Sequence, residues 1–219
     1  MTQTLKFAEA AALQDLSTYV ARAKRIEQQG IRLQAAGSVV AAWVPVMTPS
    51  SLMGRLPAVL GLRTMALGES SSADVTVELG SITERLARLT SSDLELALPP
   101  SQVNAPWAAV TPPRSGWEPQ GTVTDALLRE TAERGITQIA DAVPSSAGAA
   151  AVEQVRERVW GEPVTQTPPI PAGAAFGALS LGFLGSDDAV TSVHTLGRWT
   201  RLTSKGGYIL ARSSGTQLN

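Results

Sequence analysis

The feature that most limits how this chain folds is a proline-rich stretch from Pro99 to Gln120. Six of its 22 residues are proline, and it also holds Trp107 and Trp117. Proline interrupts helices and the interior of sheets, so the stretch separates two regions of regular structure. Structureless connections beyond about 12–15 residues are uncommon, and tryptophan gains from burial. We therefore expect an ordered arm that packs across a single domain, residues 1–219.

Patterns before the arm predict one long helix followed by antiparallel strands. Apolar residues recur at three- and four-residue steps from Leu5 to Gln29, which is typical of a helix; its buried face comprises Leu13, Leu16, Val20, Ala23 and Ile26. Alternating or β-branched segments then predict strands at 31–34, 38–47, 55–67 and 74–79, the second of them covered on both faces. A capping-box pattern at Ser81 and Glu84 predicts a helix to about Thr90, and residues 93–98 predict a short strand.

Patterns after the arm predict helices followed by a β-hairpin. A helix capped by Thr122 and running to Val143, a short loop and a second helix to Trp160 indicate an antiparallel helical hairpin. The helical period of the first helix predicts a buried face that includes Gly135 and Ile136. The glycine- and alanine-rich segment 173–184 predicts a buried helix. Segments 195–203 and 208–212 flank paired glycines and predict a terminal hairpin, followed by a frayed tail at 213–219.

Taken together, these elements indicate the α+β class. We expect an antiparallel sheet packed against the N-terminal helix and the helical hairpin, with a C-terminal β-hairpin.

The composition excludes several kinds of chemistry. The chain has no cysteine and a single histidine, His194, so disulfides and thiolate chemistry are excluded and a zinc site would need almost only carboxylates. A net charge of −1 disfavours a protein that depends on neutralising phosphates. Phosphate-loop, dinucleotide and nucleophile-elbow motifs are missing. We expect no cofactor, no metal and no catalytic residue, and enzyme activity stays open but disfavoured.

The sequence also bears on the compartment. Arginine outnumbers lysine 15 to 3, which is typical of proteins from GC-rich bacterial genomes. The first residues do not resemble a signal peptide, and the apolar stretches 35–47 and 173–185 are shorter than the roughly 20 residues of a membrane span. We expect a cytoplasmic bacterial protein that does not enter a membrane.

One acid and base grouping stands near the histidine. Asp187 and Asp188 precede His194 by a few residues, and such side chains can bind a divalent ion or transfer protons. The same Ser-Asp-Asp run is also typical of a helix cap, which is the interpretation we favour. Whether the three form a site is left open by the sequence.

Two segments combine arginine with tryptophan. In 112–119, Arg114 and Trp117 can stack and meet an anionic or aromatic ligand; alternatively Trp117 plugs the arm onto the core and Arg114 pairs with Glu118. The terminal hairpin interleaves bases with aromatics, as nucleic-acid surfaces do, although Arg198 and Arg201 fall on opposite faces of a strand. A packed hairpin with exposed arginines is the other interpretation.

By exclusion, the leading hypothesis is a non-catalytic binding or regulatory protein that contacts another protein, with the two tryptophans of the arm as interface anchors. The first alternative is a small-ligand-binding protein or metal-independent enzyme, with a pocket under the arm that takes an anionic ligand. The second is a weak nucleic-acid binder acting through the terminal hairpin. The candidate partner- or ligand-binding residues are Trp107, Arg114, Trp117, Arg198, Trp199 and Arg201.

Overall fold

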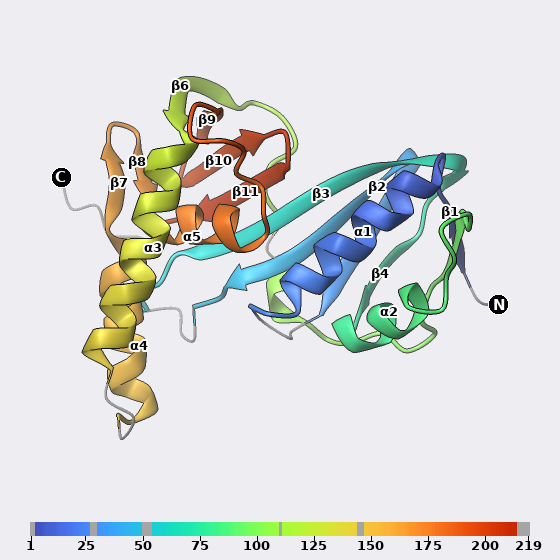
Figure 1. Cartoon of the computed structure of the whole chain (residues 1–219), viewed down its shortest axis with the longest axis horizontal. Coiled ribbons are helices and arrows are strands. Elements are labelled where there is room, and N and C mark those ends of the chain that lie inside the picture. The colour runs from blue at the N-terminus through green and yellow to red at the C-terminus, as the bar shows by residue number, and fades with distance from the viewer. Residues whose placement is uncertain (1–2, 27–29, 50–53, 110, 144–146, 214–219) are drawn as a thin grey trace. The chain divides into compact units, whose positions relative to one another are not determined.

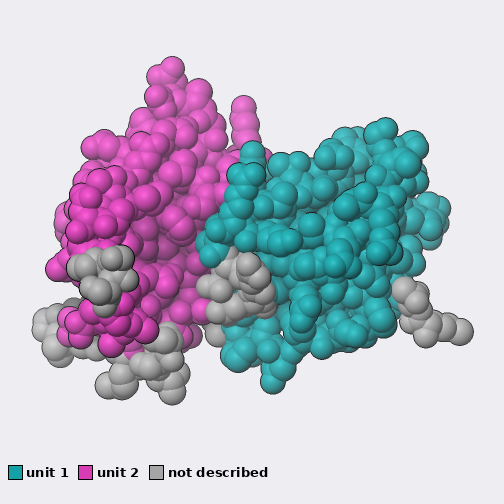
Figure 2. All heavy atoms as spheres, turned by 60° about the horizontal axis from the view of Figure 1, so that its bottom comes forward, with its two compact units in different colours: residues 1–45, 62–111 teal, residues 46–61, 112–219 magenta. Residues whose placement is uncertain are grey.

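A computed structural model describes residues 3–26, 30–49, 54–109, 111–143 and 147–213 (Figure 1). Helices and antiparallel strands are mixed along these ranges, which confirms the α+β class. The residues group into two compact units, coloured in Figure 2: unit 1 comprises 1–45 and 62–111, and unit 2 comprises 46–61 and 112–219. That the whole chain folds as one domain stays a prediction.

Unit 1 combines two helices with short and long strands. Its strands follow the order β4-β2-β3, and β1 pairs separately with β5. Helices α1 and α2 pack against each other. The elements are β1 (Thr4–Lys6), α1 (Ala10–Ala23), β2 (Ile31–Met47), β3 (Ala58–Ser71), β4 (Asp74–Val77), α2 (Leu79–Leu86), β5 (Glu95–Ala97) and the 3-10 helix η1 (Pro106–Ala109), with the end of β2 and the start of β3 assigned to unit 2.

The N-terminal helix is shorter than its sequence pattern. It begins at Ala10 because Leu5, predicted to be helical, lies fully buried in β1 opposite Leu96 of β5. It ends at Ala23, and the predicted end at 27–29 lies outside the described residues. The buried face is as predicted through Leu13, Leu16, Val20 and Ala23, because burial follows the helical period wherever the helix forms.

Two other local predictions for unit 1 are wrong. Ser81 does not cap α2; it lies inside this helix, whose N-cap is Glu78 and lacks a side-chain cap. The strand predicted at 38–47 is part of the longer β2, and it is not covered on both faces, since Val39 is exposed and Trp43 is half-buried.

Unit 2 carries the strand order β3-β11-β10-β9-β6 and three helices within the described residues. Helix α5 packs on β11, α3 packs on α5, and α4 contacts both helices. The elements are β6 (Glu118–Thr124), α3 (Asp125–Ala142), α4 (Ala149–Gly161), β7 (Pro163–Gln166), β8 (Pro169–Pro171), α5 (Ala172–Ser180), β9 (Val190–Leu196), β10 (Trp199–Ser204) and β11 (Gly207–Arg212).

Small residues let the elements of unit 2 approach closely. A Cβ at Gly177 of α5 would lie 3.3 Å from Ile209 Cδ1 on β11, so this helix rests directly on the sheet. A Cβ at Gly135 of α3 would lie 2.4 Å from the Trp160 ring, which confirms close packing at the glycine predicted to face inward. Ile136, assigned to the same buried face, is 44% exposed, so that assignment is wrong.

The start of α3 is fixed by a different threonine from the one predicted. Thr122 belongs to β6, and the Thr124 hydroxyl accepts the Leu127 amide as the N-cap. Asp125 follows it and is buried, accepting the Gly185 amide and the Thr191 hydroxyl, each at 2.6 Å. The carboxylate therefore ties α3 to β9 and to the loop before it.

The C-terminal hairpin is confirmed as β10 and β11, but the strand predicted at 195–203 is broken. Gly197 takes φ +57°, and the chain turns there between β9 and β10. The result is three antiparallel strands instead of two. Of the predicted tail, residues 214–219 lie outside the described residues. Among the described helices, none is long and apolar enough to span a membrane.

Candidate functional site

The second part of the proline-rich arm forms a tight turn that positions Trp117. Gly116 takes φ +85°, a conformation that favours glycine, and the Trp117 indole N–H donates to the Pro113 carbonyl at 3.0 Å. A Cβ at Gly116 would lie 3.6 Å from the Leu196 side chain, so the turn lies against β9. The indole is therefore held in one place by its own turn.

Arg201 of β10 lies against the ring of Trp117. The guanidinium carbon is 4.7 Å from the ring centroid, which is within the range of a cation–π interaction. The sequence suggested that Arg114 stacks on Trp117. The arginine that lies against this ring is instead Arg201. A stacked guanidinium keeps its edge N–H groups available to an acceptor in the plane.

His194 of β9 lies directly beside Arg201. The strand register pairs Arg201 with His194, and it pairs Leu202 with both Val193 and Ile209. Ile209 faces α5, so by the alternation of a strand Arg201 and His194 share the opposite face of the sheet. Neither side chain is fully buried, yet His194 Nδ1 and Arg201 Nε are shielded from solvent and make no hydrogen bond to the described residues.

Both side chains hold their positive charge less readily than usual. Burial, followed by the charge of Arg201, lowers the pKa of His194 below its ordinary value. Burial also lowers the pKa of Arg201, and Tyr208 opposes this shift. Within the described chain, no carboxylate pairs with Arg201 to offset these effects. The charge of Arg201 thus lies beside a titratable histidine and an indole, and we call these three residues, Trp117, His194 and Arg201, the 117–194–201 cluster.

The other candidate residues are spread over the chain. Trp107 is buried in unit 1, within η1, where the Arg32 guanidinium donates to the Ala108 carbonyl at 2.9 Å. Trp199 is 9% exposed on β10. Arg198 is exposed in the turn before β10 and donates to the Ser213 carbonyl at 3.0 Å.

Arg114 is exposed in the turn of the arm, and no ion pair with Glu118 forms among the described residues. Among the six candidates, all of which the structure describes, the cation–π contact joins Trp117 to Arg201.

The acidic pair near the histidine is part of another contact. Asp187 accepts from Arg129 of α3 at 3.3 Å, and both acids lie in the turn before β9. The helix-cap interpretation is wrong, because no helix begins there. In the part of the chain that the structure describes, no group of three or more acidic or histidine side chains could hold a metal ion.

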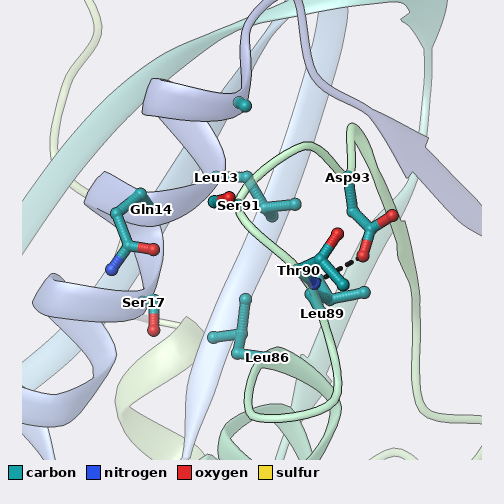
Figure 3. Close-up of a pocket in the computed structure, with 9 residues that line it drawn as sticks. Leu13, Gln14, Ser17, Leu86, Leu89, Thr90, Ser91 and Asp93 are labelled. Atoms are coloured by element: carbon teal, nitrogen blue, oxygen red, sulfur yellow. Dashed lines mark hydrogen bonds between the residues drawn. The ribbon is translucent and has the colours of Figure 1, made fainter.

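A small pocket lies elsewhere, between α1 and the loop after α2 in unit 1 (Figure 3). Leu13, Gln14 and Ser17 of α1 face Leu86 and the loop 89–93, in which the Thr90 amide donates to Asp93 at 2.6 Å. Its volume is about 30 Å³, room for a water-sized molecule, whereas sites for small molecules run to about 300 Å³ or more. We assign no ligand to it.

The sequence placed Trp117 and Arg201 among the candidates but did not bring them together, and it did not place His194 beside Arg201. Their proximity depends on the register of β9 and β10, which is fixed by the turn at Gly197. That turn was hidden inside a segment whose apolar pattern reads as one continuous strand.

Comparison with known proteins divides the chain at the middle of the arm. Each half matches a domain family of its own. Residues 1–109 match a domain of unknown function (DUF8010), and residues 112–216 match another domain of unknown function (DUF8185). No curated protein sequence matches the chain.

Solved structures with a similar fold include bacterial DNA polymerase sliding clamps. A putative DNA polymerase III beta subunit from Eubacterium rectale aligns over 99% of this chain with a TM-score of 0.59 and 9% identity. DNA polymerase sliding clamps from Pseudomonas aeruginosa and Bacillus subtilis align over 100% and 99% of this chain, both with a TM-score of 0.53, at 10% and 9% identity. The chain spans 66%, 66% and 65% of those three proteins, just under two thirds of their length. The similarity establishes a sliding-clamp-like fold.

Proposed function

We propose that this chain is a non-catalytic, cytoplasmic scaffold that binds another protein through the surface around Trp117. The observation that carries the proposal is the fold similarity, which extends over 99% of the chain. The similar proteins are named as the beta subunit or the sliding clamp of a DNA polymerase. These names describe proteins that work with another protein, the polymerase. Transfer of that role to this chain is our proposal, since identity is only 9–10%.

The 117–194–201 cluster supplies suitable anchors for such a contact. Trp117 and Arg201 are each half-buried, so part of each side chain is fixed and part remains accessible. Tryptophan and arginine are the residue types most enriched among side chains that dominate binding energy. Arg114 is exposed in the same turn and adds a positive charge at the rim of this surface.

Site-specific crosslinking tests this function. A photo-crosslinking amino acid at exposed Ser115, beside Trp117, should capture a defined protein in extracts of the source cells. The same group at Glu133, exposed on α3, provides a matched control on another surface of unit 2. We expect a product from position 115 that is missing at position 133 and is lost in the variant Trp117→Ala.

Binding of the captured protein is then measured with purified components. Trp117→Ala should weaken the interaction by about tenfold or more, as expected for an interface anchor. Identical products from positions 115 and 133, or unchanged affinity in Trp117→Ala, would contradict the proposal.

The two alternatives from the sequence stay predictions. A small anionic ligand under the arm should raise the melting temperature in a metabolite screen, because saturating ligand stabilises the folded state. Nucleic-acid binding through the hairpin should weaken steeply with salt. It is disfavoured by the net charge of −1 and by the separation of Arg198, in a turn, from Arg201, which lies against Trp117.

A further inference from the structure

The 117–194–201 cluster places a cationic arginine beside a titratable histidine, and no carboxylate pairs with either among the described residues. Arg201 and His194 are direct neighbours across β9 and β10, and each has a nitrogen that is shielded from solvent and unpartnered within the described residues. The half-buried arginines at 32, 63 and 129 pair with aspartates, whereas Arg201 has the Trp117 ring as its neighbour. Polar groups shielded from water normally find a partner.

The surroundings of the pair are uncharged or only weakly polar. Trp117 covers one face of the guanidinium, Pro119 of β6 is the register partner of His194, and Leu210 of β11 is the register partner of Arg201. Tyr208, on the same face of β11, is the one titratable group found to act on Arg201. No acidic side chain on this face of β6 or β11 neutralises the pair.

The available donors suit an anion with more than one oxygen. The Trp117 ring lies against the guanidinium of Arg201, and the planar fork of N–H donors of a guanidinium can bind a carboxylate or phosphate through two oxygens. A protonated imidazole on the neighbouring strand adds a further charged donor. The indole keeps water from one side of the Arg201 guanidinium, which strengthens a charge-assisted hydrogen bond.

We propose that Arg201 and His194, held against Trp117, form a binding site for an oxyanion group, a carboxylate or a phosphate. A protein partner is not required for this site to exist, so it stands or falls separately from the proposed function. An anion placed between the two side chains favours the protonated imidazole, whose charge burial and Arg201 otherwise oppose. By linkage, anion binding raises the pKa of His194, and affinity increases as the pH falls.

His194 is the only histidine of the chain, so its imidazole gives a single, unambiguous NMR signal. The whole chain is titrated over pH with three salts at equal ionic strength: sodium chloride, sodium acetate and inorganic phosphate. We expect a higher pKa of His194 in at least one oxyanion than in chloride, with a saturable shift of the signal at fixed pH. A shift with acetate alone identifies a carboxylate site, and a shift with phosphate alone identifies a phosphate site.

Two variants separate the site from a general charge effect. Arg201→Gln should lower the affinity for the anion, measured from the saturable shift of the His194 signal, by about tenfold or more. This is the loss expected when a charge-assisted hydrogen bond is removed. Arg198→Gln removes the same charge from the adjacent turn and should leave the shift unchanged. The proposal is overturned if wild-type His194 titrates identically in all three salts, or if Arg198→Gln abolishes the shift as fully as Arg201→Gln.

Discussion

The packing of Gly135 against Trp160 allows a sharp test of unit 2. A Cβ at position 135 would lie 2.4, 2.8 and 3.2 Å from three ring carbons of Trp160, whereas carbon atoms normally approach to about 3.5–4.0 Å. The ring cannot easily retreat, since Trp160 is 3% exposed and its centroid lies 4.8 Å from that of Phe176. Overpacking of this kind costs about 1–3 kcal/mol.

Helix propensity acts in the opposite direction and must be subtracted. Alanine in place of glycine favours a helix by about 0.5–1 kcal/mol. Gly135→Ala should therefore lower the free energy of unfolding by roughly 0–2.5 kcal/mol, with a central value of about 1 kcal/mol. Gly80→Ala is the matched control, because Gly80 also lies in a helix and has no atom within 4 Å of its would-be Cβ. That variant should be neutral or more stable by about 0.5 kcal/mol.

Urea unfolding followed by circular dichroism measures both variants. The expected result is a lower midpoint for Gly135→Ala with an unchanged slope, which indicates a stability change without a change in compactness. Equal stabilisation by Gly135→Ala and Gly80→Ala would refute the contact between α3 and Trp160.

Three further predictions concern charged side chains. Asp125→Ala leaves the Gly185 amide and the Thr191 hydroxyl without their acceptor, so unfolding by urea should show a loss of about 2–4 kcal/mol, with a smaller loss in Asp125→Asn. Arg32→Ala removes the hydrogen bond to the Ala108 carbonyl and the ion pair with Asp74. Limited proteolysis should therefore cleave within 101–109 faster in this variant than in the wild type. Equal cleavage rates would show that Arg32 does not anchor this segment. Because the pKa of His194 is lowered in the folded state, its contribution to stability is present above about pH 6.5 and is lost as the pH falls. The melting temperature of the wild type should therefore fall more in mild acid than that of His194→Gln, as measured by thermal unfolding in sodium chloride.

The sequence predicted elements best where one local signal decides the structure. Helical periodicity located the buried face of α1, and the strict alternation of Val75 and Val77 located β4. The sequence was less successful in predicting where helices and strands begin and end, because tertiary pairing overrides local preference there. Leu5 joins a strand because Leu96 lies opposite, and nothing near Leu5 in sequence signals this partner.

The candidate site was predicted in part for the same reason. Local composition identified Trp117 as a candidate anchor, and the arginine-rich hairpin identified Arg201. Their contact joins residues 84 positions apart and depends on a turn at Gly116 and a strand register, neither of which is a local preference of either side chain. His194 joins them only through that register.

The contact between Trp117 and Arg201 underlies both the proposed surface and the oxyanion site, and NMR measures it directly. Protons over an indole face experience its ring current, so the Arg201 Hδ and Hε signals should lie upfield of their usual positions and return in Trp117→Leu. Cross-relaxation peaks should connect the indole to the Arg201 side chain. Arg201 signals at ordinary positions that do not respond to Trp117→Leu would show that the indole does not cover the guanidinium.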